Sequence, residues 1–221
     1  MNPKLGAPPA HVTVEPSDLR MHGGTLWRIH RDSPDRPGWN QLRHHGPVPG
    51  MRFDPHEPPR GDDKNEGVQY LATRVADAFA EAFQTTRVIP LRDPRIRLVG
   101  WEPTRELTLL DLNGAWGVRN GASATLPTGP KRYTQPWARA IHQQLPEIDG
   151  LWHHGAMAGG DLVTLFTPAE RGPAERGPAE RGPVERGPVW PAAPTFSRSL
   201  ADPLSRAVVL AVGRKLGYSI G

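Results

Sequence analysis

Arginine is the most abundant of the residue types able to do chemistry in this chain. The 221 residues include 23 Arg and 4 Lys but no Cys. A planar guanidinium suits phosphate and carboxylate oxygens, so the composition allows a phosphate-bearing ligand, although the coding bias of a GC-rich genome would also enrich Arg, Ala, Gly and Pro. The absence of cysteine excludes disulfides, thiolate metal sites and cysteine nucleophiles. Any catalysis therefore depends on Arg, His, carboxylates or hydroxyls.

Two pairs of adjacent histidines, His44–His45 and His153–His154, raise the question of a metal site. Adjacent side chains on a strand point to opposite faces, and no carboxylate stands at helical i, i+4 spacing from either pair. We therefore expect no metal. The net charge is +4, but the basic residues are scattered rather than gathered in a stripe, which argues against direct nucleic-acid binding.

The chain contains no run of about 18 apolar residues that could cross a membrane. Its start, Met-Asn-Pro-Lys followed by further prolines, lacks the apolar core of a signal peptide. These features predict a cytoplasmic protein with no membrane association.

Short strands mixed with helices predict an α+β fold in one domain. Strands are expected at 25–30, 68–72, 87–90, 96–99, 107–112, 151–153 and 162–166. The content of 24 Gly and 26 Pro disfavours a helical bundle. Residues 1–23 are Pro-rich without periodicity and are expected to form an extended N-terminal arm, which leaves 24–221 for the domain.

Three helices are predicted from apolar residues that recur at every fourth position. The three apolar faces consist of Val75, Phe79 and Phe83; Trp137, Ile141 and Leu145; and Leu204, Val208 and Val212. Thr73, Pro136 and Pro203 mark the expected helix starts, and Gly217 marks the end of the last helix. On the first helix, Glu81 falls opposite the apolar face, where a solvated carboxylate is also expected.

Two segments of the domain lack regular periodicity. Residues 31–67 are crowded with Pro, Gly, Asp and His around one short island, 51–55, and a loop of this length is usually functional or disordered. The second segment repeats Pro-Ala-Glu-Arg-Gly from Pro168 to Gly187, with Val for Ala in the last copy. Each copy is neutral and contains Pro and Gly, so we expect a disordered insert at 168–189.

Several short motifs follow one another in a distinctive order along the chain. They are Leu26-Trp27-Arg28-Ile29, Gly50-Met51-Arg52-Phe53-Asp54-Pro55, Tyr70-Leu71-Ala72, Glu81, Leu109-Leu110-Asp111-Leu112, Gln135-Pro136-Trp137-Ala138, Asp149-Gly150-Leu151 and Leu216-Gly217-Tyr218. This ordered set resembles the RES-domain family. The resemblance implies a single RES domain similar to the ADP-ribosyltransferase fold. It also implies an NAD-degrading toxin of a bacterial toxin–antitoxin pair, with a helical, DNA-binding antitoxin as its partner.

The resemblance also implies site residues, with NAD as the substrate and no resident cofactor. Cleavage of the nicotinamide–ribose bond builds positive charge on the sugar. Glu81 would oppose that charge, Arg28 and Arg52 would hold phosphate, and Tyr70 would pack on a ring of NAD, with His153 as a further substrate-binding residue. The residues alone equally allow Tyr70 to be a core aromatic and an arginine such as Arg52 to pair with a carboxylate such as Asp54.

The family's expected serine falls at Gly155 in this chain, and a position often held by Tyr is His153. Either His153 or His154 substitutes for the hydroxyl, or the ligand is held differently, or activity is lost. The resemblance therefore leaves several functions open. They are NAD hydrolysis, NAD phosphorolysis with inorganic phosphate as co-substrate, ADP-ribosyl transfer to a macromolecule, and a catalytically degenerate binding module.

Overall fold

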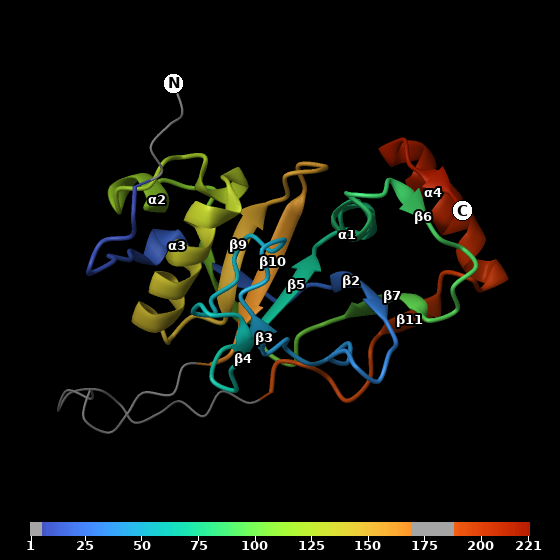
Figure 1. The fold of residues 1–221 in the computed structure, drawn as a ribbon, viewed down its shortest axis with the longest axis horizontal. Coiled ribbons are helices and arrows are strands. Elements are labelled where there is room, and N and C mark those ends of the chain that lie inside the picture. The colour runs from blue at the N-terminus through green and yellow to red at the C-terminus, as the bar shows by residue number, and fades with distance from the viewer. Residues whose placement is uncertain (1–5, 169–187) are drawn as a thin grey trace.

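A mixed eight-stranded sheet forms the centre of the fold, in the order β1-β8-β9-β10-β5-β2-β7-β11 (Figure 1). The computed structural model describes residues 6–168 and 188–221. The strands are β1 (Leu19–His22), β2 (Leu26–Arg31), β5 (Val68–Ala72), β7 (Ile96–Trp101), β8 (Leu107–Asp111), β9 (Gly150–His154), β10 (Asp161–Phe166) and β11 (Phe196–Ser199). Neighbours are antiparallel except the parallel pair β8–β9.

The remaining elements surround this sheet. The α-helices are α1 (Val75–Ala82), α2 (Trp116–Arg119), α3 (Lys131–Gln144) and α4 (Arg206–Leu216), with 3₁₀ turns η1 (Pro16–Asp18), η2 (Leu126–Thr128) and η4 (Pro203–Ser205). Two small sheets pair β3 (His45–Gly46) with β4 (Gly61–Asp62) and β6 (Val88–Ile89) with β12 (Ser219–Ile220). The predicted α+β class is confirmed.

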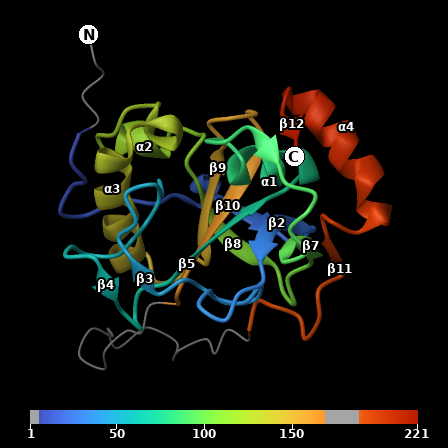
Figure 2. The same cartoon turned by 45° about the vertical axis from the view of Figure 1, so that its right-hand side comes forward.

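Helices α1, α3 and α4 lie on one face of the sheet, with α3 at one end and α1 and α4 toward the other (Figures 1 and 2). We call the boundary between these two helix groups the seam. The register places Tyr70 on β5 beside Thr164 on β10, and Ala72 beside Trp27 on β2, so these side chains share that face. Helix α3 packs over the half of the sheet that contains β8 and β9. Helix α1 buries Phe79 over the other half, together with α4. Strands β5 and β10 therefore form the floor of the seam.

Loops cover the opposite face of the sheet. Leu26 and Leu71 are buried there, and Trp39 and Trp190 pack onto them from the loops. Gln69 fixes both loops, because its Nε2 donates to Trp39 O at 2.7 Å and its Oε1 accepts from Trp190 Nε1 at 3.1 Å. The loop 31–67 thus contributes Trp39 to the packing on this face.

The N-terminal segment differs from the predicted extended arm, because part of it belongs to the domain. Residues Leu19–His22 form β1, which pairs with β8 at one edge of the sheet. Val12 and Val14 pack against the core beneath α3. A four-residue edge strand has too few residues for a clear period, and its pairing with β8 is a long-range contact. The same shortness explains why β3, β4, β11 and β12 were not predicted.

Most of the predicted insert at 168–189 lies outside the described residues, but its C-terminal boundary needs correction. Val189 packs on the loop-covered face of the sheet. Its carbonyl accepts from Thr104 N at 3.1 Å. The domain therefore resumes before residue 190.

Three helical predictions also need correction. Helix α3 begins at Lys131, so Pro136 lies inside the helix instead of at its start. Thr73 does not cap α1; its Oγ1 donates to Asp161 O at 3.1 Å and joins the helix start to β10. On α4 the fully buried residue is Val209, whereas Leu204 and Val208 of the predicted face are 73% and 43% exposed.

Candidate active site

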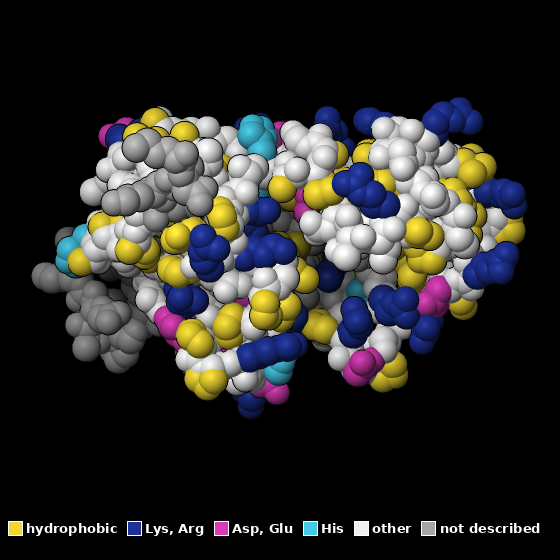
Figure 3. Space-filling model, turned by 45° about the horizontal axis from the view of Figure 1, so that its top comes forward, with side chains coloured by type: hydrophobic (Ala, Val, Ile, Leu, Met, Phe, Trp, Pro, Cys, Tyr) yellow, Lys and Arg dark blue, Asp and Glu magenta, His cyan; other side chains and the backbone are white. Residues whose placement is uncertain are grey.

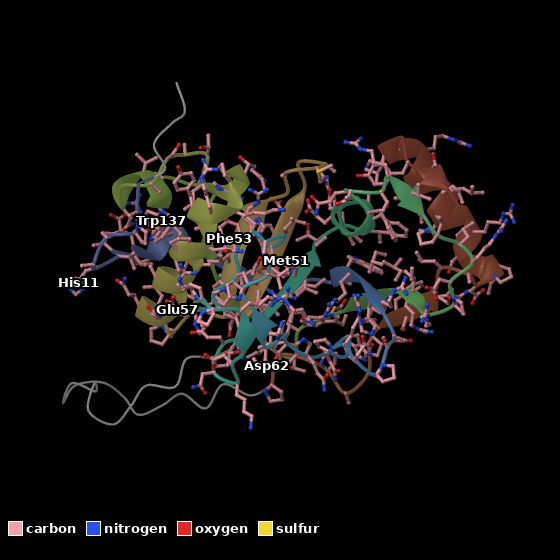
Figure 4. All side chains as sticks on the ribbon, viewed as in Figure 1. His11, Met51, Phe53, Glu57, Asp62 and Trp137 are labelled. Carbon is pink, nitrogen blue, oxygen red and sulfur yellow. The ribbon has the colours of Figure 1, made fainter. Side chains whose placement is uncertain are left out.

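The seam between the two helix groups gathers four of the predicted site residues from four separate segments. Tyr70 lies on β5, His153 on β9 and Glu81 on α1. Arg52 comes from the loop between β3 and β4, which crosses in front of β9 and β10 and carries the labelled Met51 and Phe53 (Figure 4). Contacts between distant segments thus bring these groups together.

Glu81 occupies a partly buried site within the seam. Burial raises the pKa of Glu81, against a hydrogen bond from the Met157 backbone and the positive charge of Arg52. Its Oε1 is buried and has no hydrogen-bond partner among the described residues. A buried oxygen without a donor costs free energy, so this atom is available to a ligand hydroxyl.

Arg52 faces Glu81 from the other side of the seam. Burial lowers the pKa of Arg52, while Glu81 and Tyr70 act in the opposite direction. One of its N–H groups donates to Gly129 O, just before α3, and its own carbonyl accepts a hydrogen bond from Thr134. The guanidinium is therefore anchored beside the carboxylate and keeps further donors for a phosphate.

A buried carboxylate, Asp54, holds the loop that presents Arg52. Asp54 accepts hydrogen bonds from His56 Nδ1 at 2.6 Å, from Arg43 at 2.8 Å and from Val48 N at 2.7 Å. Burial by itself raises the pKa of Asp54, but these partners outweigh it and lower the pKa to about 2. Asp54 thus pairs with Arg43, which leaves Arg52 free for the seam.

This network predicts an acid-dependent loss of stability. Because the pKa of Asp54 is lower in the folded chain than its unfolded value near 4, its stabilisation is complete above about pH 4 and is lost as the pH falls toward 2. The lost free energy of unfolding should be about 2 kcal/mol, measured by urea denaturation at each pH. The Asp54→Asn variant should lack this part of the acid loss.

Asp62 provides a matched control for this experiment. It also pairs with a histidine, His45, at 2.8 Å, but its side chain is 86% exposed. The Asp62→Asn variant should keep the full acid loss of the parent protein. An unchanged acid profile in Asp54→Asn would show that Asp54 does not stabilise the loop in this way.

Tyr70 and His153 form the floor beneath Arg52. Burial raises the pKa of Tyr70, and so does the charge of Asp54, whereas Arg43 and Arg52 near its hydroxyl act in the opposite direction. Burial lowers the pKa of His153 to about 4, so its ring is neutral near pH 7. That ring packs on Phe53 with centroids 4.7 Å apart, and its Nε2 lies 3.0 Å from Thr164 Oγ1. Tyr70 and His153 therefore form an aromatic floor, with the Tyr70 hydroxyl near Arg43 and the His153 ring against Phe53.

Gly155 lies directly against Glu81. A Cβ at Gly155 would stand 3.0 Å from Glu81 Oε1 and 3.1 Å from Leu162 Cδ1. Its N–H donates to Gly160 O at 2.7 Å and closes the β9–β10 hairpin. Its φ lies outside the left-handed region, so a serine needs no strained backbone there.

The two histidines proposed as substitutes for the missing hydroxyl are engaged elsewhere. His153 is only 3% exposed and makes the contacts with Phe53 and Thr164 described above. His154 is exposed and pairs with Asp161 at 3.0 Å. Neither imidazole donates a hydrogen bond to Glu81 Oε1, because this oxygen has no partner among residues 6–168 and 188–221.

Arg28 is the one predicted site residue that lies apart from the others. Trp27 and Ala72 face α1, so the next side chain on β2, Arg28, points to the opposite face beside Val99. Burial lowers its pKa to about 10, and one of its Nη atoms has no partner among the described residues. This placement corrects the expectation that both arginines line one site, because the sheet separates Arg28 from Glu81.

Lys131 is a site neighbour that the sequence analysis missed. It is the first residue of α3, and its charge opposes the raised pKa of Glu81. Pro130 directly precedes it, and a proline at a helix start is a signal that could have located this residue. Lys131 adds a second cation to the side of the seam where Arg52 is anchored.

Two further searches covered the part of the chain that the structure describes. No group of three or more His, Asp or Glu side chains there could hold a metal ion. No described helix is both long and apolar enough to cross a membrane.

Comparisons with known proteins agree with the observed fold. No curated protein matches the chain. A solved structure, the toxin–antitoxin complex MbcT–MbcA of M. tuberculosis, contains a similar chain with a TM-score of 0.50 and 15% identity, over 90% of this chain and 91% of that one. At this identity the likeness concerns the fold alone. The sequence model of the RES domain matches residues 25–186, more than half of the chain, so the protein belongs to the RES domain family.

Proposed function

We propose that this protein consumes NAD by cleaving the bond between nicotinamide and ribose. The observation that carries the proposal is Glu81, a carboxylate in the seam with Arg52 opposite it and with a buried oxygen that has no hydrogen-bond partner among the described residues. A site that stabilises a sugar cation needs an anion held in a partly dry environment. Membership of the RES domain family favours NAD over other glycosidic substrates.

Each residue of the seam has a distinct part in this reaction. The C–N bond breaks and its electron pair leaves with nicotinamide, so positive charge develops on the ribose. Glu81 opposes this charge and accepts a hydrogen bond from a ribose hydroxyl, contacts that strengthen in the transition state. Arg52 pairs with the pyrophosphate or an attacking phosphate, while Tyr70 packs on a ring of NAD.

The acceptor determines the product. Attack by water gives ADP-ribose, nicotinamide and a proton, which is glycohydrolase chemistry. Attack by inorganic phosphate gives ADP-ribose phosphorylated at the anomeric carbon, which is phosphorylase chemistry. Arg52 and Lys131 on the same side of the seam favour phosphate, because two cations raise the local concentration of an anion.

We further propose that the protein is the toxin of a toxin–antitoxin pair in the cytoplasm. The support is the family membership and the shared fold with a chain of a toxin–antitoxin complex. Its partner would be a helical, DNA-binding antitoxin that covers the seam. The protein itself would bind neither DNA nor membrane.

A catalytically degenerate binding module is the second candidate, and Gly155 is the observation that favours it. The family's serine hydroxyl is missing beside Glu81. The two neighbouring histidines do not replace it, because His153 contacts Thr164 and His154 pairs with Asp161. Such a module would bind NAD or a related nucleotide without consuming it.

Incubation of the purified protein with NAD, with and without phosphate, tests these proposals through the identity of the products. We expect nicotinamide release that phosphate accelerates. Labelled protein or nucleic acid would instead indicate ADP-ribosyl transfer, and intact NAD bound to the protein would indicate the degenerate module. In bacterial cells, expression alone should deplete NAD and stop growth, and co-expression of an antitoxin encoded beside the gene should restore both.

A further inference from the structure

A groove lies on the far side of α1 from the seam, between α4 and the strands β7 and β11. Its volume is about 260 Å³. Nine side chains line the groove, among them Phe79, Leu98, Leu204, Ser205, Val208 and Val209. Seven of these nine side chains are apolar, so the groove can bury apolar groups of another molecule.

One wall of this groove is a ridge of exposed apolar side chains. Leu204 is 73% exposed and Val208 is 43% exposed, four positions apart on η4 and α4. Together with Val212, their spacing predicted a buried face, but only Val212 of the three is buried, and the fully buried residue of α4 is Val209. Exposed apolar residues grouped along a groove mark interaction sites more often than isolated ones do.

The C-terminal segment that forms one side of the groove is rich in basic residues. The described residues from Pro188 to the C-terminus contain one acidic residue, Asp202, whose carboxylate accepts from Leu204 N at 2.8 Å and lies 3.9 Å from Arg198. Four basic residues share this segment: Arg198, Arg206, Arg214 and Lys215. Figure 3 shows Lys and Arg side chains among hydrophobic ones at the end of the molecule where α4 lies, with few acidic side chains between them.

We propose that this groove binds an acidic amphipathic helix of a partner protein, with apolar side chains in the groove and carboxylates facing the basic rim. A helix suits the site because apolar side chains four positions apart form a ridge that packs into the grooves of a second helix. Carboxylates suit it because Arg206 lies exposed beside Ser205 at the rim.

The concave shape favours a protein helix over a lipid surface. Membrane-binding helices lie with a convex apolar face in the headgroup layer. Here Phe79 and Leu98 form the floor of a recess, which only protruding side chains can reach. The groove is also separate from the reaction site, because Phe79 and Glu81 extend from different sides of α1. The proposal therefore does not depend on the function proposed for the seam.

The probe is a labelled synthetic peptide of about 15 residues, which is titrated with the full-length protein. It has Leu at i, i+4, i+7 and i+11 and Glu elsewhere on the helix. Fluorescence anisotropy should show saturable binding that weakens with salt. Val208→Glu and Arg206→Glu should each weaken binding by about tenfold or more. Leu210→Glu is the matched control, because Leu210 is also 43% exposed on α4 but does not line the groove.

Each alternative outcome would overturn the proposal in a defined way. Equal binding of a peptide with Lys in place of Glu would remove the charge argument. Binding of phosphatidylserine vesicles with no binding of the acidic peptide would assign the surface to a membrane. A concentration-dependent dimer that Val208→Glu abolishes, again without peptide binding, would assign it to a second copy of the chain. No binding of any probe, or equal loss in Leu210→Glu, would exclude the groove as a helix site.

Discussion

The Glu81→Gln variant is expected to lose NAD turnover by about 10²- to 10³-fold or more while its fold stays intact. Gln keeps the size of the side chain but cannot oppose positive charge on the ribose. Burial raises the pKa of Glu81, so the folded protein gains little from the ionised carboxylate there. The melting temperature should therefore change little, whereas the kcat measured by nicotinamide release should fall.

The matched control for this variant is Glu106→Gln. Glu106 is exposed, at the start of the segment that leads into β8, away from the seam. Its turnover should equal that of the parent protein. Full activity in Glu81→Gln would remove Glu81 from the mechanism, and an equal loss in both variants would point to the assay or to folding.

The Gly155→Ser variant is expected to raise NAD turnover by about 2-fold to 100-fold. A Cβ here would lie 3.0 Å from Glu81 Oε1, the oxygen that has no donor among the described residues. The added hydroxyl can donate to this oxygen or to a substrate phosphate. One such hydrogen bond contributes about 0.5 to 1.5 kcal/mol when neutral and up to about 3 kcal/mol when charge-assisted, which gives the stated range. The close contact requires the carboxylate to shift slightly, as the end of a flexible side chain can.

Gly155→Ala separates the hydroxyl from the added bulk, because it introduces the same Cβ alone. Its turnover should not rise. A rise in both variants would attribute the gain to packing against Leu162 and Glu81. A folded Gly155→Ser protein without increased turnover would favour the degenerate binding module.

Local patterns in the sequence determined the class of the fold, most of its longer elements and the presence of Glu81 on a helix. Val75 and Phe79 recur at helical spacing and pack over the sheet as α1. The stretch 68–72 is strand β5, as predicted. These patterns succeed because helix and strand periods depend on residues a few positions apart. The order of short motifs also sufficed to indicate the RES domain family, which the domain match then confirmed.

The faces on which these elements meet were decided only by the tertiary structure. Alternation along β2 places Trp27 and Arg28 on opposite faces of the sheet but does not say which face each one takes. The pairing of Trp27 with Ala72, both packed against α1, determines that Arg28 faces away from Glu81. On α4 both Val208 and Val209 could be buried, and packing with α1, β6, β7 and β12 selects Val209. Periodicity defines the sides of an element, whereas contacts between residues far apart in the chain determine which side meets a neighbour. For the same reason, Glu81, which helical periodicity alone would place in solvent, faces a seam formed by the β3–β4 loop, α3 and the β9–β10 hairpin.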